Sequence, residues 1–344
     1  MSLPELQSVM LEAGGQKFRA KQLAEWLYKR GAHDFAAMNN MPKALREQLA
    51  ASYTIGRPRI IRRQDSANGE TTKYLLEFAD GTAIETVLMR HDYGNSVCVS
   101  TQAGCAMGCS FCASTLHGVV RNLTSGEILA QVVAMNDLLR DEEGSHVNTI
   151  VVMGSGEPLM NYEELLRFLH LVHEPYTLGL SYRNITVSTC GIVNRMYDLA
   201  QEGIPISLSL SLHAPNQPLR EHLMPIAKKY DIKEVVAAAD HYARQTGRRV
   251  TYEYILIDGV NDLEEHAREL ARLVQGQLAS VNLIPINPVA ERGFNRPPAE
   301  HVQRFAAVLS GYGVNVTVRR EMGDDIQAAC GQLRNRHLQD KAKG

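Results

Sequence analysis

The sequence predicts an α/β fold: a partial (β/α)6 barrel preceded by a small N-terminal helical domain and a β-hairpin connector. Three observations support this prediction. Short helical segments occupy the first 50 residues, two strand-like runs flank an Ala-Asp-Gly turn at 79–81, and strand-like and helix-like segments then alternate as far as residue 319. Such sustained alternation indicates a parallel sheet with helices packed against it.

The part of the prediction that precedes the barrel rests on hydrophobic periodicity and turn residues. Apolar residues at helical spacing predict three helices, over residues 3–12, 20–29 and 43–51. The Ala-Asp-Gly turn joins two predicted strands, 72–78 and 84–89, into a hairpin. We therefore expect three units: the helical domain at 1–52, the connector at 53–93, and the barrel with its C-terminal segment at 94–344.

The barrel prediction follows from six strand–helix units and one further strand. The strands are predicted over residues 97–101, 148–153, 184–188, 206–212, 250–257, 280–286 and 314–319. The helices are predicted over residues 125–139, 162–172, 193–201, 233–244, 263–274 and 300–309. Thr124 and Glu127 have the spacing of a capping box at the start of the first helix. Because loops at the C-terminal ends of barrel strands carry the chemistry, polar residues there are the site candidates.

Length and composition predict a globular cytoplasmic protein. The 344 residues exceed one usual core, and 44% hydrophobic with 22% charged residues is typical of folded domains. No apolar stretch suits a membrane span or signal peptide, so we expect no membrane partner. A net charge of −2 by itself gives no support for nucleic-acid binding. Two cationic clusters could face phosphates or form solvated surface: Lys17, Arg19, Lys21, Lys29 and Arg30, and then Arg57, Arg59, Arg62 and Arg63.

Three cysteines form a compact C-x3-C-x2-C triplet: Cys105, Cys109 and Cys112. In a reducing compartment, clustered cysteines indicate metal binding or catalysis in preference to structural disulfides. A four-iron cubane held by three thiolates keeps one iron open for another ligand. A closed zinc site would need a fourth ligand, for which His117 is the near candidate. The spacing alone leaves both metal centres open.

The triplet resembles the signature of the radical S-adenosylmethionine (SAM) superfamily, whose typical core is a partial (β/α)6 barrel. The resemblance implies a [4Fe–4S] cluster whose open iron binds the amino and carboxylate groups of SAM. Gly156 and Glu157 lie in a G-S-G-E-P sequence at the end of the strand predicted over 148–153. In the superfamily a motif of this kind holds the amino group of SAM, so both residues are predicted to bind it.

Further polar groups follow other predicted strands. Ser188 ends the third strand, the run Ser211-Leu212-His213 follows the fourth, and Asn287 follows the sixth. These residues could hydrogen-bond the ribose, adenine and carboxylate of SAM, because parallel strands bring their C-terminal ends to one rim. Each could instead be a structural cap or turn residue.

Six motifs together resemble the RlmN/Cfr family of radical SAM RNA adenosine methyltransferases. They are I-E-T-V, C-V-S-T-Q-A-G-C-A-M-G-C-S-F-C-A-S-T, R-N-L-T, G-S-G-E-P-L, L-S-L-H-A-P-N and D-I-Q-A-A-C-G-Q-L. Within the family the A-S-T and R-N-L segments are most similar to RlmN, which methylates C2 of adenosine in 23S rRNA and tRNA. The resemblance spans nearly the whole chain, including K-F-R-A-K-Q and E-W-L-Y in the helical domain.

The resemblance implies roles for three further residues. Cys330 matches the cysteine that accepts a methyl group from one SAM, before a radical made from a second SAM removes a hydrogen atom from that methyl. Cys98 matches the cysteine that resolves the protein–RNA adduct by a transient disulfide with Cys330. Glu85 matches the proton acceptor. Cys190 departs from the pattern, since serine is usual there; we interpret it as a buried substitute, although it lies close in sequence to Ser188.

The resemblance also implies the partners and leaves alternatives. The substrate is an unpaired or flipped-out adenosine of 23S rRNA, and also of tRNA, recognised with help from the helical domain. Electrons come from a flavodoxin or ferredoxin, and we expect a monomer. The alternatives are a Cfr-like C8 methyltransferase that confers ribosomal antibiotic resistance, a glycyl-radical activase, and a zinc-stabilised RNA-binding module.

Overall fold

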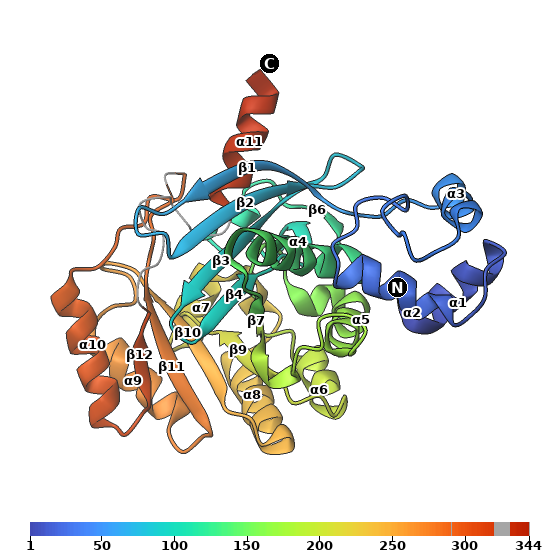
Figure 1. The fold of residues 1–344 in the computed structure, drawn as a ribbon. Helices are drawn as coiled ribbons and strands as arrows, with labels where there is room; N and C mark the ends of the chain where they lie inside the picture. The colour runs from blue at the N-terminus through green and yellow to red at the C-terminus, as the bar shows by residue number, and fades with distance from the viewer. Residues whose placement is uncertain (290, 320–330, 344) are drawn as a thin grey trace.

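A ten-stranded sheet forms the centre of the molecule (Figure 1). The structure is a computed structural model, and it describes residues 1–289, 291–319 and 331–343. The strands lie in the order β1-β2-β3-β4-β7-β8-β9-β10-β11-β12, which is also their order along the chain. Neighbours in space are therefore neighbours in sequence, as expected for a chain that winds in one direction around a barrel.

The parallel part of the sheet confirms the predicted partial (β/α)6 barrel. Its strands pair in parallel in chain order: β4 (Gly94–Cys98), β7 (Val147–Val152), β8 (Ile185–Thr189), β9 (Ser207–Ser211), β10 (Val250–Leu256), β11 (Ala279–Pro285) and β12 (Val316–Val318). The helices between them lie outside the curved sheet in Figure 1: α4 (Ser125–Glu143), α5 (Tyr162–His173), α6 (Val193–Gln201), α8 (Ile232–Thr246), α9 (Glu264–Val274) and α10 (Ala299–Gly311). Apolar side chains of the strands and helices form one continuous core.

Local sequence explains how the first barrel helix starts and stops. The Thr124 hydroxyl accepts from the Glu127 backbone amide while the Glu127 carboxylate accepts from that of Thr124, so the predicted capping box is confirmed. The helix ends at Gly144, which adopts the left-handed conformation that glycine tolerates without steric cost. Between these caps α4 buries ten residues and packs against α5 and β7.

The predicted hairpin is part of the same sheet. The antiparallel strands are β1 (Arg59–Asp65), β2 (Thr71–Glu77) and β3 (Ala83–His91), and β3 pairs in antiparallel fashion with β4. Backbone hydrogen bonding therefore runs without a break from the connector into the barrel. The proposed boundary near residue 93 stays a prediction, since it falls in the β3–β4 turn of a single sheet.

The N-terminal helices form the predicted small module at one end of the molecule (Figure 1). They are α1 (Leu3–Glu12), α2 (Arg19–Tyr28) and α3 (Lys43–Ser52), each within one residue of its predicted bounds. The module is fixed to the barrel by an ion pair, with the Arg57 guanidinium 2.9 Å from the Asp137 carboxylate of α4. The Leu3 amide also donates to the Tyr176 hydroxyl at 3.1 Å. Arg57, a member of the second cationic cluster, is thus used for domain packing.

Several short elements escaped prediction. They are β5 (Gln102–Gly104), β6 (Val119–Asn122), α7 (Gln217–Leu223), α11 (Gln332–Lys343) and four 3-10 helices, Ala113–Thr115, Pro158–Asn161, Tyr182–Asn184 and Pro225–Lys228. Pairing of β5 with β6 closes a two-stranded sheet around the cysteine triplet. Except for the twelve-residue α11, these elements are too short for a periodic signal, and contacts with distant segments hold them in place. Among the described residues, no helix is long and apolar enough to cross a membrane.

Candidate active site

A cavity of about 310 Å³ opens at the C-terminal ends of the barrel strands. It brings together six of the residues predicted from sequence: Cys98, Cys112, Ser188, Ser211, His213 and Asn287. They come from β4, the cysteine loop, β8, β9 and the segments that follow β9 and β11. The parallel sheet therefore collects polar groups from separate strand ends at one rim, as the sequence predicts.

The cysteine loop is fixed by its own backbone and by Thr115. The Cys105 amide donates to the Gly118 carbonyl at 3.1 Å, which ties the start of the loop to its end. The Thr115 hydroxyl donates to the carbonyls of Cys109 at 3.2 Å and Cys112 at 2.9 Å. These bonds are local and hold the backbone of the loop from Cys105 to Gly118.

The three thiols suit an iron–sulfur cluster better than a single zinc ion. Within the described residues, the sulfur atoms of Cys105, Cys109 and Cys112 do not all lie within 4.8 Å of one another. Thiolates around one tetrahedral zinc ion would be roughly 3.8 Å apart, as Zn–S bonds near 2.3 Å require. The other zinc ligand candidate is also engaged, because His117 Nε2 lies 2.6 Å from the Asn335 amide oxygen of α11. The wider donor set fits a multi-iron group.

Burial favours the protonated form of two of these thiols, Cys105 and Cys109. Desolvation raises the pKa of Cys105 to about 11, and it raises the pKa of Cys109 further. The neighbouring thiols add to both shifts, because negative charges close together oppose one another. Metal binding at the triplet is therefore expected to release protons and to be favoured by higher pH.

Glu157 lies beside the cysteine loop, and its carboxylate accepts three hydrogen bonds. It accepts from the backbone amides of Leu159 at 2.9 Å and Cys190 at 2.7 Å, and from the Thr189 hydroxyl at 2.8 Å. Burial raises its pKa, while these hydrogen bonds act in the opposite direction. Gly156 precedes it with φ +107°, and a Cβ atom there would come within 2.9 Å of the Gln102 amide nitrogen. Only glycine permits this approach, so Gly156 places Glu157 without itself lining the cavity.

His213 is held as a neutral hydrogen-bond donor toward the cavity. Its Nδ1 accepts from the Ile255 amide at 3.0 Å, which leaves the proton on Nε2. Desolvation, with a contribution from Arg220, lowers the pKa of His213 to about 3. The residue has φ +59°, an uncommon conformation outside glycine, and the Asn261 side chain fixes it by donating to the His213 carbonyl at 2.9 Å.

The other predicted SAM ligands differ in how far they reach the cavity. The hydroxyls of Ser188 and Ser211 lie 3.5 Å apart at its wall. The Leu212 side chain is fully buried in the core, and its backbone amide donates to the Glu253 carbonyl at 3.1 Å. Leu212 therefore contributes backbone position and no side-chain contact to the cavity. Cys190, also buried, presents its amide to Glu157 and its carbonyl to Arg220.

Glu85 joins the barrel to the C-terminal segment. Its carboxylate lies 3.2 Å from the Lys73 ammonium, and the two side chains are 5% and 0% exposed. It also accepts from the backbone amides of Gly331 at 2.8 Å and Arg334 at 2.6 Å, and so caps the start of α11. Cys330, the proposed methyl carrier, lies outside the described residues. The described chain resumes at the next residue, which Glu85 binds directly.

Replacement of Lys73 by methionine is expected to destabilise the folded protein by about 3–5 kcal/mol, because it leaves the Glu85 charge buried without its cation. Denaturant unfolding monitored by circular dichroism measures this change. The control is Lys43→Met, which breaks an exposed pair with Glu47 whose side chains are 82% and 66% exposed. That change should stay within about 0.5 kcal/mol of the parent. Equal losses in both variants would contradict the importance of the buried pair.

Sequence reasoning missed two charged residues of the cavity, Glu253 and Arg319. Glu253 lies on β10, accepts from the Asn282 side chain at 2.8 Å, and has its pKa raised by burial. A carboxylate in the middle of the apolar run T-Y-E-Y-I-L was the available signal, because strand interiors seldom bury a charge without a partner. Arg319 follows β12 and acts on Glu253 electrostatically.

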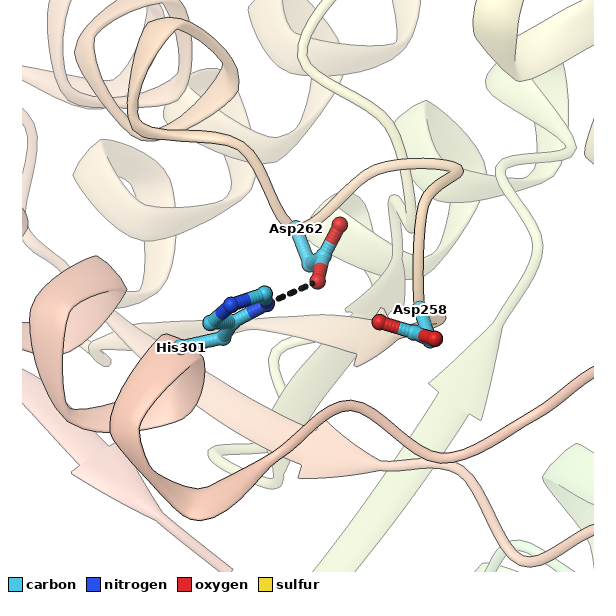
Figure 2. A group of neighbouring side chains, drawn as sticks. All are labelled: Asp258, Asp262 and His301. Carbon is cyan, nitrogen blue, oxygen red and sulfur yellow. Dashed lines mark hydrogen bonds and ion pairs between the residues drawn. The ribbon is translucent and has the colours of Figure 1, made fainter.

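A second group of metal-type side chains lies away from the cysteines (Figure 2). One ligand atom each from Asp258, Asp262 and His301 falls within 4.8 Å of the others. The Asp262 carboxylate accepts from the Gly259 amide at 3.0 Å and pairs with His301 Nδ1 at 2.9 Å. These contacts tie α10 to the loop after β10, and that structural role accounts for the group.

Comparison with known proteins agrees with this geometry over the whole chain. The family model "Radical SAM superfamily" matches residues 99–274, and "Ribosomal RNA large subunit methyltransferase N-terminal domain" matches residues 1–55. A "Probable dual-specificity RNA methyltransferase RlmN" from Symbiobacterium thermophilum is 55% identical, covering 98% of this chain and 90% of that protein. Another with the same description, from Geobacillus kaustophilus, is 50% identical, covering 100% and 93%. The crystal structure of a radical SAM methyltransferase from Sphaerobacter thermophilus superposes with TM-score 0.93 at 45% identity, covering 96% and 97%.

Proposed function

The chain belongs to the RlmN family of radical SAM proteins, and on this premise we propose that it methylates C2 of one adenosine in 23S rRNA and one in tRNA. Membership of the radical SAM superfamily implies a [4Fe–4S] cluster and SAM as cofactors. A flavodoxin or ferredoxin would supply electrons. The proposal goes beyond the family description in the position methylated, in the route through Cys330 and in the role of each site residue.

The described residues have separate tasks in this proposal. Cys105, Cys109 and Cys112 would hold the cluster, and Glu157 beside them would bind the amino group of SAM. The cavity residues that would bind the rest of SAM are Ser188, Ser211, His213 and Asn287. When bound, the cluster and SAM together supply a 5′-deoxyadenosyl radical. His213 carries its proton on Nε2 and stays neutral. It can therefore donate a hydrogen bond from Nε2 to an acceptor such as a carboxylate at any physiological pH.

The observation that carries the methyl-cysteine route is the position of Gly331. Its amide donates to Glu85, and a Cβ atom on it would come within 2.5 Å of the Ser114 amide nitrogen, two residues after Cys112. The residue that follows Cys330 is therefore packed against the cysteine loop. Cys98 lines the same cavity as Cys112. This arrangement supports Cys330 as methyl carrier and Cys98 as its disulfide partner.

Glu85 fits the role of proton acceptor only if one of its present contacts is released. Both carboxylate oxygens already accept, one from Lys73 and Gly331 and the other from Arg334. A carboxylate oxygen of Glu85 can therefore take up a proton only where one of these contacts has opened. We propose that Glu85 takes the proton lost by the adenine ring carbon, and that movement of the C-terminal segment frees it to do so.

Mass spectrometry of nucleosides from treated RNA tests the proposed function. Anaerobically reconstituted protein, SAM and a reductant should convert one adenosine of a 23S rRNA fragment, and one of tRNA, to 2-methyladenosine. Detection of 8-methyladenosine would favour the Cfr-like alternative. Unmodified RNA together with a glycyl radical on a protein substrate would instead indicate an activase.

The helical domain offers a cationic surface with an exposed aromatic ring. Phe18 is 59% exposed, lies between exposed Lys17 and Lys21 at the start of α2, and has the Arg19 guanidinium 5.2 Å from its ring centroid. The other cationic cluster is engaged in ion pairs: Arg57 with Asp137, Arg59 with Glu77, Arg62 with Asp340, and Arg63 with Asp65 and Glu142. We propose that the surface formed by Lys17, Phe18, Arg19 and Lys21 contacts RNA.

Replacing Lys17 and Lys21 together by alanine should weaken RNA binding and reduce the slope of log K against log salt by about 1.4–1.8, the contribution of two phosphate contacts. Phe18→Ala should cost about 1–3 kcal/mol without changing the slope, because base stacking is not ionic. Fluorescence anisotropy with labelled tRNA at several salt concentrations measures both. Arg59→Ala is the matched control and should leave affinity nearly unchanged. A larger loss in that control would place the RNA surface elsewhere.

A further inference from the structure

Arg220 is a fully buried cation whose hydrogen-bonding capacity is largely unused. It lies on α7, and its side chain is 0% exposed. One terminal nitrogen, Nη2, donates to the Cys190 carbonyl at 2.7 Å. Its Nε and Nη1 atoms have no hydrogen-bond partner in the part of the chain that the structure describes. A guanidinium keeps its charge in proteins, and burying one without an anionic partner costs several kcal/mol. The buried Arg220 guanidinium therefore needs an anionic partner.

The helix that carries Arg220 is packed against the cysteine loop. The Leu223 carbonyl at the end of α7 accepts from the Ser110 amide at 2.9 Å and from its hydroxyl at 3.3 Å. A Cβ atom on Gly108 would lie 3.4 Å from Pro225, just beyond α7. Ser110 and Gly108 flank Cys109, so this helix covers the side of the loop on which the second cluster ligand lies.

The anions within electrostatic reach point to the cluster site. The groups whose charge acts on Arg220 are the thiols of Cys190 and Cys109 and the carboxylate of Asp231. Asp231 is already the N-cap of α8, where it accepts from the Lys233 amide at 2.8 Å. Glu157 binds the same residue through the Cys190 amide. None of these groups accepts a hydrogen bond from Nε or Nη1 of Arg220. A sulfide-rich anion held by Cys109 would offer acceptors for these two donors.

We propose that Arg220 is the internal counter-cation of the [4Fe–4S] cluster and favours its reduced state. The inference rests on the proposed function only in requiring that cluster. An oxidised cubane core carries charge +2 and three thiolates bring the site to −1; one electron from a flavodoxin-type reductant brings it to −2. A fixed positive charge in a low-dielectric interior stabilises the second state more than the first. Charge and hydrogen bonds near the sulfurs are recognised determinants of cluster potential.

The rival account makes Arg220 a structural clamp. Its bond to the Cys190 carbonyl fixes the turn after β8, and through that turn the position of Glu157. A clamp would matter equally with and without the cluster, and it would not change the cluster potential. A counter-cation, by contrast, destabilises the metal-free protein and stabilises the protein when the cluster is bound. The two roles therefore predict opposite effects on the metal-free protein.

Redox titration of the reconstituted full-length protein, followed by electron paramagnetic resonance of the reduced cluster, tests the proposal. Arg220→Met should lower the ratio of reduced to oxidised cluster at a poised potential about tenfold, a shift of about 59 mV for one electron. Arg220→Lys, which keeps the charge, should stay near the parent. The matched control is Arg248→Met, another arginine with an unpaired Nε, which donates to Ser207 at the start of β9, the strand end remote from the cluster. An unchanged potential in Arg220→Met overturns the proposal.

Thermal unfolding of the metal-free and reconstituted proteins gives a second measurement. Metal-free Arg220→Met should be at least as stable as the metal-free parent, because an uncompensated buried charge is removed. Reconstitution should raise its melting temperature less than it raises that of the parent. If metal-free Arg220→Met unfolds earlier or fails to fold, the clamp is correct and the proposal is wrong. A parent protein that binds no four-iron cluster would instead defeat the proposed function itself.

Discussion

Replacement of Cys330 by alanine is expected to abolish RNA methylation, to leave the iron and sulfide content unchanged, and to leave uncoupled reductive cleavage of SAM still detectable. The C2 carbon of adenine is electron-poor, so direct polar transfer of a methyl cation from SAM cannot reach it, and the proposed route needs a thiolate to carry the methyl group. The proposed cluster ligands are three other cysteines, which this change does not touch. Nucleoside mass spectrometry, iron analysis and measurement of 5′-deoxyadenosine separate the three quantities.

An isotope experiment with the parent protein makes the same prediction quantitative. If SAM carrying a trideuterated methyl group loads Cys330 and one hydrogen atom is then removed from that methyl, the methyl group in RNA should contain two deuterium atoms. Retention of all three would contradict the proposed route.

The matched control for Cys330→Ala is Cys190→Ser, which replaces another buried thiol near the cysteine loop and should keep full methylation. Methylation by Cys330→Ala would likewise defeat the proposal.

Gly331→Ala is expected to lower the methylation rate by at least about tenfold while the cluster is retained. Gly331 has φ +85°, where a Cβ atom costs about 1–2 kcal/mol. The new methyl would also come within 2.5 Å of the Ser114 amide nitrogen, and overpacking of this kind costs about 1–3 kcal/mol. Both free-energy costs weaken the packing of Gly331, the residue after Cys330, against the cysteine loop. Single-turnover methylation assays with parallel iron analysis measure the outcome.

Gly276→Ala separates backbone strain from the close approach. Gly276 has φ +80°, nearly the same conformation, but no atom lies within 4 Å of the position its Cβ would occupy. It should lose a similar small amount of stability and keep the parent methylation rate. A Gly331→Ala protein that methylates as fast as Gly276→Ala would show that docking of the C-terminal segment against Ser114 is not needed for methyl transfer.

Long periodic segments were predicted well, and segments shaped by distant contacts were not. The six barrel helices and the hairpin strands appear where hydrophobic periodicity and turn residues placed them, because their signals extend over many residues. Strand β4 ends at Cys98, although the apolar run predicted a strand to residue 101. Ser100 is instead held by two hydrogen bonds that involve side chains. Its amide donates to the Gln131 side chain, and its hydroxyl donates to the Glu85 backbone carbonyl. Those partners are 31 and 15 residues away, and no local pattern specifies them.

The candidate site divides in the same way. Sequence placed Ser188, Ser211, His213 and Asn287 at one rim, since strand alternation fixes which ends meet. It did not show that Glu157 already accepts three hydrogen bonds, or that Glu85 caps α11. Arg220 received no role from sequence, because an arginine in the short segment Q-P-L-R-E-H-L reads as solvated helix surface. Its burial depends on packing against the cysteine loop.

The amino-acid sequence by itself determined the family, the winding of the barrel and the thiols proposed to bind metal, because closely spaced cysteines and periodic apolar residues act over short stretches of chain. Only the tertiary structure decided which charges are paired, which thiols share a cavity, and how Gly331 packs against Ser114. The physical reason is burial: a side chain's charge and hydrogen-bonding state depend on what excludes water from it, and residues far away in the sequence do this.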